Sequence, residues 1–182
     1  MVDLAGNRIA GIHAGVTQLN DGRFIALGRG SNLEGRMPVS ISADMGRSWT
    51  YKKTIFPPIG GGQRLVLIRL KEGPLFLASF SRDMTVTCPD GHSENASGLF
   101  GALSYDGGRS WPVRRLITDG KPAHQVQAMD GRQFTMSTTS AEPAGYMAGV
   151  QSPDGIIHLI SSKQYYAFNI VWLKQAGVKL EF

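Results

Sequence analysis

Short apolar runs alternate with turn residues along the chain, and no stretch carries the 3.6-residue period of an amphipathic helix. Three acidic-glycine pairs, Asp21-Gly22, Glu72-Gly73 and Asp154-Gly155, each follow one apolar run and precede another. Two apolar runs joined by such a tight turn are typical of a β-hairpin with buried strands. The predicted strand pairs are 12–19 with 23–28, 64–70 with 75–80, and 146–151 with 156–161.

An eight-residue pattern, Ser-x-Asp-x-Gly-x-Ser-Trp, follows the first two hairpins, at Ser42–Trp49 and again at Ser104–Trp111. Its aspartate, Asp44 or Asp106, can accept hydrogen bonds from backbone N–H groups of its own turn. The glycine permits a positive φ where the chain reverses, and the tryptophan begins a new strand and packs its ring under the turn. We therefore expect a repeated hairpin, with both tryptophans largely buried.

Each complete unit then contains four strands in a meander. A strand leads into each eight-residue pattern, over 37–43 and 99–104, and another begins at its tryptophan, over Trp49–Ile55 and Trp111–Ile117. A third unit has its first hairpin and an expected third strand over residues 168–173. The predicted fold is all-β, with three antiparallel units at residues 11–56, 63–118 and 145–174, the last of them incomplete.

The repeated pattern resembles the Asp-box of the sialidase-like β-propeller family, whose members carry BNR repeats. Segments 61–70 and 145–155 resemble the same repeat. The resemblance implies a six-bladed propeller of four-stranded antiparallel blades, with the Asp-boxes on the face opposite the active site. This chain supplies about three blades, and three blades cannot close a ring. The resemblance therefore implies part of a propeller, completed by the remaining blades or by a second copy of the chain.

Composition narrows the class of partner. The 182 residues suffice for one domain with a core, and the net charge of +5 is scattered, with Lys52-Lys53 and Arg114-Arg115 as the densest basic spots. This distribution argues against a nucleic-acid interface and suits a small anionic partner. The single cysteine, Cys88, excludes an internal disulfide and a cysteine-based zinc cluster, and the sequence indicates neither a metal nor a cofactor.

The sequence shows no segment typical of a membrane span or a signal peptide. No apolar stretch is long enough to span a membrane, and residues 1–7 lack the apolar run of a signal peptide. The resemblance nevertheless implies a secreted or periplasmic location for a full-length protein.

Equivalent positions in the three hairpins carry polar residues. Counting back eight residues from the acidic residue of each turn reaches His13, Arg64 and Tyr146, at the start of each innermost strand. In an up-and-down unit these strand starts share one face, here called the top face, while the acidic-glycine turns and the Asp-boxes share the bottom face. We expect the three side chains to converge on the top face. The alternative is that these strand starts are polar only because they face the solvent along the central axis of a propeller.

Loops on the top face add candidates, because binding residues collect on loops held by a rigid scaffold. Arg36 and Glu142 lie in such loops, and the third unit offers Tyr165. We interpret His158, inside a strand, as a packed core residue. The expected top-face loops cover residues 29–36, 81–97 and 119–145.

The family resemblance assigns chemistry to these positions. In sialidases a tyrosine is the nucleophile, a glutamate is its base, and arginines bind the sugar carboxylate through parallel hydrogen bonds. The resemblance implies an exo-acting glycoside hydrolase for an anionic or polar glycan. A propeller that binds a carbohydrate or a protein without catalysis is the alternative, and a purely structural module is a third. The implied residues are Tyr146 and Glu142 for catalysis, and His13, Arg36, Arg64 and Tyr165 for the sugar.

Overall fold

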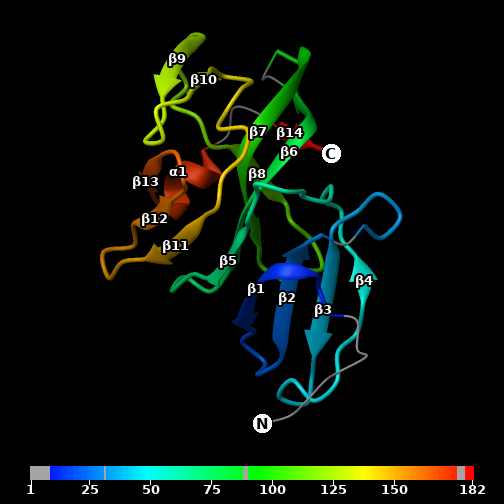
Figure 1. Ribbon diagram of the computed structural model, residues 1–182. Coiled ribbons are helices and arrows are strands. Elements are labelled where there is room, and N and C mark those ends of the chain that lie inside the picture. Colours follow the sequence, from blue (N-terminus) through cyan, green and yellow to red (C-terminus); the bar gives the residue numbers. More distant parts are fainter. Residues whose placement is uncertain (1–8, 31, 88–89, 176–178) are drawn as a thin grey trace.

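The computed structural model describes residues 9–30, 32–87, 90–175 and 179–182, so Cys88 and residues 1–7 lie outside the described residues. Four antiparallel sheets and one five-residue helix make up the described part, and none of these sheets is closed (Figure 1). The prediction of an all-β chain is therefore confirmed. The described helix is too short to cross a membrane.

The first sheet is the four-stranded meander that the pattern predicts. Its strands pair antiparallel in chain order, and Gly22 closes the first turn with a φ of 85°, which glycine adopts without strain. The strands are β1 (Ile12–Gln18), β2 (Phe24–Arg29), β3 (Pro38–Ser42) and β4 (Lys52–Lys53).

The second sheet contains the same meander with a long extension. Its strands are β5 (Val66–Arg69), β6 (Leu75–Thr87), β7 (Ser93–Ser104) and β8 (Val113–Leu116), and β14 (Lys179–Glu181) pairs with the far end of β6. The loop expected over 81–97 is wrong, because β6 and β7 continue pairing beyond a register shift between Ser81 and Met84. Met84 and Val86 alternate as buried positions, which is the period of a strand.

The third sheet departs from the prediction after its first hairpin. Its strands are β11 (Ala148–Gln151), β12 (Ile157–Ile160) and β13 (Tyr165–Phe168), followed by helix α1 (Ile170–Lys174). The third strand predicted over 168–173 is wrong. Asn169 caps the helix instead, because its side chain accepts a hydrogen bond from the N–H of Trp172 at 2.9 Å. No fourth strand joins this sheet among the described residues.

A further hairpin occupies the segment 119–145, which the sequence pattern presents as a loop. It consists of β9 (His124–Gln127) and β10 (Gln133–Met136), joined through Asp130-Gly131. This is a fourth acidic-glycine turn, with Gly131 at a φ of 81°. Its apolar positions alternate with glutamine, histidine and threonine, so the hairpin has one small buried face and one wet face.

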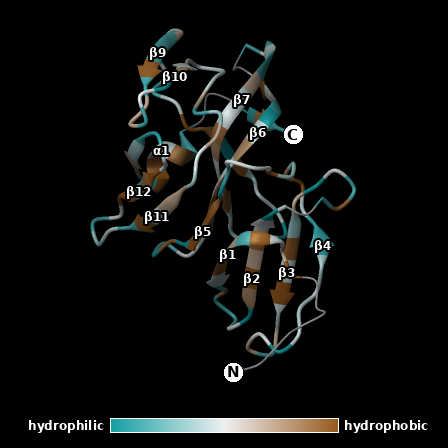
Figure 2. Cartoon of the chain, viewed as in Figure 1, coloured by the Kyte–Doolittle hydropathy of each residue, from teal (hydrophilic) through white to brown (hydrophobic). Residues whose placement is uncertain are grey.

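The three larger sheets share an apolar core, and their innermost strands lie next to one another. β5 contacts β1 on one side and β11 on the other (Figure 1). Glycines permit this approach: a Cβ added to Gly15 would lie 2.8 Å from Cβ of Leu67, and one added to Gly149 would lie 3.0 Å from Cγ1 of Val66. Figure 2 shows the hydrophobic residues along β5 and β12 that build this core.

Both Asp-box turns are held by their aspartates as expected. Asp44 accepts hydrogen bonds from the N–H and the hydroxyl of Ser48 at 2.8 and 2.6 Å, and Asp106 accepts the same pair from Ser110 at 2.9 and 2.6 Å.

The expected burial of the two tryptophans is confirmed only in part. Trp111 is 4% exposed and packs edge-on against Phe56, with ring centroids 5.3 Å apart. Trp49 is only partly buried.

Candidate functional site

The top ends of the innermost strands meet, and they bring three predicted residues together. Arg64 and Tyr146 form a parallel bridge, in which the N–H of Arg64 donates to the carbonyl of Gly145 at 3.0 Å. The rings of His13 and Tyr146 meet edge to face, with centroids 5.6 Å apart and planes at 87°. Equivalent strand starts in three sheets therefore form one cluster.

Arg29, at the top end of β2, completes this cluster, and the sequence did not single it out. Its Nη1 donates to the Tyr146 hydroxyl oxygen at 3.0 Å and to the carbonyl of Gln63 at 3.3 Å. Its guanidinium carbon lies 5.7 Å from the centroid of the Tyr146 ring. The four residues His13, Arg29, Arg64 and Tyr146 are called the top-face cluster below.

Arg29 is a buried cation, and no acidic partner lies beside it in the part of the chain that the structure describes. The residue is only 8% exposed, and its Nε is buried with no hydrogen-bond acceptor. No carboxylate among the described residues forms an ion pair with it. Burying a charge without a counterion is costly, so this arrangement favours an anion that arrives from outside. Tyr146 is 44% exposed, so a ligand can reach the cluster.

Local backbone geometry directs His13 into the cluster. The pairing of β1 with β2 shifts register between Ile12 and Gly15, and His13 has a φ of 52°, in the left-handed region that non-glycine residues rarely adopt. Bulges of this kind re-aim a side chain, and strained residues are concentrated at functional sites.

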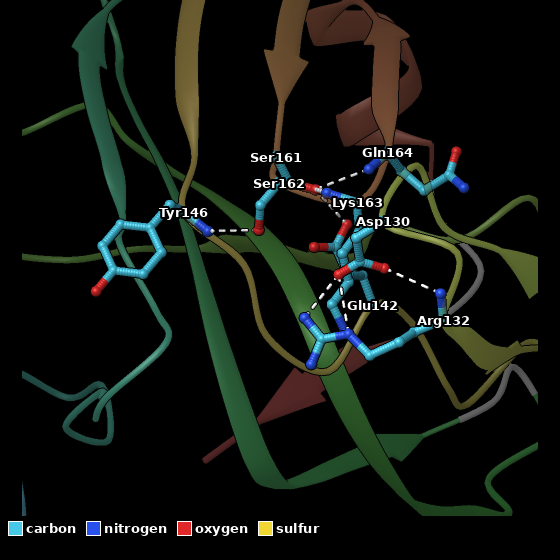
Figure 3. A network of polar contacts seen from close by, with 8 residues as sticks. All are labelled: Asp130, Arg132, Glu142, Tyr146, Ser161, Ser162, Lys163 and Gln164. Atoms are coloured by element: carbon cyan, nitrogen blue, oxygen red, sulfur yellow. Dashed lines mark hydrogen bonds and ion pairs between the residues drawn. The ribbon is translucent and has the colours of Figure 1, made fainter.

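Glu142 does not face Tyr146, although the resemblance pairs them. Its Oε2 accepts hydrogen bonds from the hydroxyls of Ser161 and Tyr166, both at 2.8 Å, and the residue is completely buried. Burial raises the pKa of Glu142, and burial together with the negative charge of Glu142 raises the pKa of Tyr166. Figure 3 shows the Tyr146 ring directed away from Glu142.

The contact between these two segments runs through the backbone. The N–H of Tyr146 donates to the hydroxyl of Ser162 at 3.3 Å, next to the serine that Glu142 holds (Figure 3). A Cβ added to Gly145 would lie 2.3 Å from Oε1 of Glu142. Glu142 therefore fixes the turn that positions Tyr146 and is not in reach of its hydroxyl.

Arg36 and Tyr165 make their contacts elsewhere. Nη1 of Arg36 donates to the carbonyl of Ile55 at 2.8 Å, beside β4. The hydroxyl of Tyr165 lies 2.6 Å from Nδ1 of His158, whose Nε2 lies 2.9 Å from the hydroxyl of Ser152. His158 is thus a partly exposed residue of the third sheet, and its interpretation as a core residue is wrong. The described residues hold no group of metal-ligating side chains.

Comparisons with known proteins add little to this geometry. No protein-family model and no curated protein matches the sequence. One solved structure, of a protein of unknown function from Dyadobacter fermentans DSM 18053, is similar at a TM-score of 0.47 and 15% identity. The match covers 92% of this chain and 37% of that one, so this chain spans little more than a third of its length.

Proposed function

We propose that this chain is part of a sialidase-like β-propeller and that its top-face cluster binds a carboxylated glycan. The observation that carries the proposal is Arg29, a buried guanidinium that donates to the exposed Tyr146 and has no acidic partner among the described residues. A guanidinium matches a carboxylate geometrically, and Arg64, an exposed residue whose backbone pairs with Tyr146, is a candidate for a second contact. Aromatic faces such as that of Tyr146 suit the apolar side of a sugar ring.

The arrangement of the sheets supports the propeller. Two antiparallel meanders of four strands lie next to each other through their inner strands, and a three-stranded sheet continues the row. The Asp-box aspartates, Asp44 and Asp106, follow the bottom ends of β3 and β7, whereas the top-face cluster lies at the opposite strand ends. A propeller has the same division between turns that hold the fold and ends that bind a ligand.

Hydrolysis of the bound glycan is the second candidate function. It is favoured by one contact, since Arg29 places a cation 3.0 Å from the oxygen with which Tyr146 would attack a sugar. Glycoside cleavage also requires carboxyl groups for proton transfer. Glu142 turns away from Tyr146, and no other carboxylate contacts the cluster in the described ranges. Binding requires only groups that are present here, so binding is the better supported function.

Calorimetric titration with N-acetylneuraminic acid, glucuronic acid and their methyl esters tests the proposal. We expect an acidic sugar to bind, its neutral ester to bind at least tenfold more weakly, and Arg29→Gln and Arg64→Ala to lose about tenfold or more in affinity because a charge pair is removed. Arg36→Gln, which alters an arginine outside the cluster, should bind normally. Equal affinity for acid and ester would refute the proposal.

A further variant, Tyr146→Phe, separates binding from catalysis. Tyr146→Phe removes only the hydroxyl oxygen, so sugar binding should change by a few-fold at most. If the protein also hydrolyses a fluorogenic sialoside, that turnover should disappear in Tyr146→Phe while affinity remains. Turnover that survives in Tyr146→Phe would exclude Tyr146 as the nucleophile.

A further inference from the structure

The outer edge of the third sheet is open where the other two meanders are closed. β13 is the last strand in its sheet, whereas β3 and β7 are each covered by a fourth strand, β4 or β8. The chain after β13 enters helix α1 and does not return to this edge within the described residues. The third sheet therefore offers a free strand edge at the place that a fourth strand fills in its neighbours.

The register of the hairpin identifies which backbone groups are free. The N–H of Ser161 donates to the carbonyl of Gln164, so Ser161 with Gln164 is a hydrogen-bonded pair, and Leu159 with Tyr166 is the next one. In an antiparallel pair the intervening residues direct their N–H and C=O groups to the opposite side. Tyr165 and Ala167 therefore present two donors and two acceptors along the open edge.

The side chains of this edge differ from those of the other outermost strands. β4 is Lys52-Lys53, and β8 contains Arg114 and Arg115. Charged residues on edge strands prevent pairing with further strands. β13 reads Tyr-Tyr-Ala-Phe, without a charge or a proline. The exposed lysines of β4 thus protect that outermost strand, whereas β13 carries no such charge and is ready to pair.

A groove runs beside the open edge. It has a volume of about 630 Å³ and lies between β13, the β9–β10 hairpin and α1, with Val126, Met136 and Trp172 among its walls. Main-chain hydrogen bonds along an edge provide affinity for an added strand, and adjacent apolar walls select its side chains. The free donors and the apolar groove therefore lie side by side.

We propose that β13 accepts an extended peptide segment as a fourth antiparallel strand, with apolar side chains of that segment in the groove beside Trp172. The partner is an extended polypeptide with apolar residues at alternate positions. The proposal does not depend on glycan binding, since the open edge and the top-face cluster share no residue.

The first test uses a blocked synthetic peptide, Thr-Val-Ser-Ile-Ser-Val-Thr, in which apolar residues alternate with uncharged polar ones. We expect saturable binding by fluorescence or calorimetric titration, and no binding of a scrambled peptide. Two N-methylated versions, blocked at alternate residues, should differ: the version whose methyl groups face β13 should lose binding at least tenfold, and the other should not. Failure of the parent peptide to bind, or equal binding of all versions, would overturn the proposal.

The second test alters the edge itself. Ala167→Pro removes an N–H that points away from β12, and proline is tolerated at such a position, so the fold should persist while peptide affinity falls at least tenfold. Ala167→Val keeps the N–H and should bind like the wild type. Unchanged binding by Ala167→Pro would contradict the assignment of the edge.

Hydrogen exchange keeps the proposal testable if Ala167→Pro does not fold. In the wild-type chain the amides of Tyr165 and Ala167 should exchange quickly and slow at least tenfold with saturating peptide, while the amide of Tyr166 is protected throughout. Unchanged exchange at Tyr165 and Ala167 in the bound state would overturn it. Dimerisation through this edge without peptide, detected by sedimentation, would also overturn it by making a second copy the occupant.

Discussion

The two Asp-box turns share one sequence pattern and one set of internal hydrogen bonds, but their surroundings differ. The glycines at the fifth position, Gly46 and Gly108, have φ values of 86° and 88°. The tryptophans that follow diverge: Trp111 is 4% exposed, and Trp49 is only partly buried. The same eight-residue pattern therefore forms the same turn twice, but its tryptophan is buried to different extents.

The difference comes from neighbouring sheets and not from the motif. Trp111 contacts Phe56, which follows the fourth strand of the first unit, and Gly108 lies against Ile25 of β2. The second turn is thus enclosed between the first and second sheets. The first turn has no sheet on the equivalent side within the described residues. Hydrogen bonds of a short motif specify the turn, and packing of the next unit determines how much stability its tryptophan contributes.

Replacing the two tryptophans with alanine should give the largest difference in stability loss between the two turns. Trp111→Ala is expected to lower the free energy of unfolding by about 3–5 kcal/mol, because it empties a filled core site. Trp49→Ala should cost about 1–2 kcal/mol, because less apolar surface is buried there. Urea titration followed by circular dichroism measures both values. Equal losses would show that the motif, and not the neighbouring sheet, sets the contribution.

Replacing the turn glycines with alanine should give a smaller difference in stability loss between the two turns. Alanine at either position must adopt a positive φ, which costs roughly 1–2 kcal/mol. At Gly108 the added Cβ would also lie 2.6 Å from Cδ1 of Ile25, whereas at Gly46 the nearest such atom, in the Trp49 ring, is 3.8 Å away. Gly108→Ala should therefore unfold at lower urea than Gly46→Ala.

A double variant tests why Gly108→Ala should cost more stability than Gly46→Ala. Ile25→Val removes the Cδ1 methyl group that a Cβ added at Gly108 would meet, so Gly108→Ala should cost less in that background than in the wild type. Additive losses would assign the whole effect to the backbone conformation.

Turn chemistry predicted most of the fold because it is local. Acidic-glycine pairs and the Asp-box gave the first two meanders and the first hairpin of the third sheet. The β9–β10 hairpin was missed, although Asp130-Gly131 is the same signal, because its strands bury only a narrow apolar stripe. Helix α1 was not predicted because its cap, Asn169, is a single polar residue between an apolar strand and the apolar run Ile170–Leu173.

The candidate site was predictable only where the repeat fixes position. The common register led to His13, Arg64 and Tyr146, which do meet. Arg29 was overlooked because a charged residue after an apolar strand reads as the start of an exposed loop, and its burial depends on residues far along the chain. The pairing of Glu142 with Tyr146 came from the family resemblance, which does not determine the direction of a side chain in this chain.

Acid titration should give the smallest difference between the two turns, because both aspartates accept hydrogen bonds from the same kinds of groups in their own turns. The side chain and N–H of Ser48, with the hydroxyl of Ser42, lower the pKa of Asp44 to about 2. Partial desolvation raises the pKa of Asp106, but hydrogen bonds from Ser110, Ser104 and Arg109 together outweigh it and lower this pKa also to about 2.

Each carboxylate therefore contributes stability that is present above its ordinary pKa of 3.8 and is lost as the pH falls through 4 towards 2. Asp44→Ala and Asp106→Ala should both lower the urea midpoint at pH 7, and both should flatten its decline between pH 4 and pH 2 relative to the wild type. The two slopes should match each other even though the tryptophan variants do not, and neither change should alter sugar affinity, since both turns lie at the end of the strands opposite the top-face cluster. A flattened slope in Asp106→Ala alone would contradict this expectation, because it would mean that the same turn hydrogen bonds do not lower the pKa of Asp44.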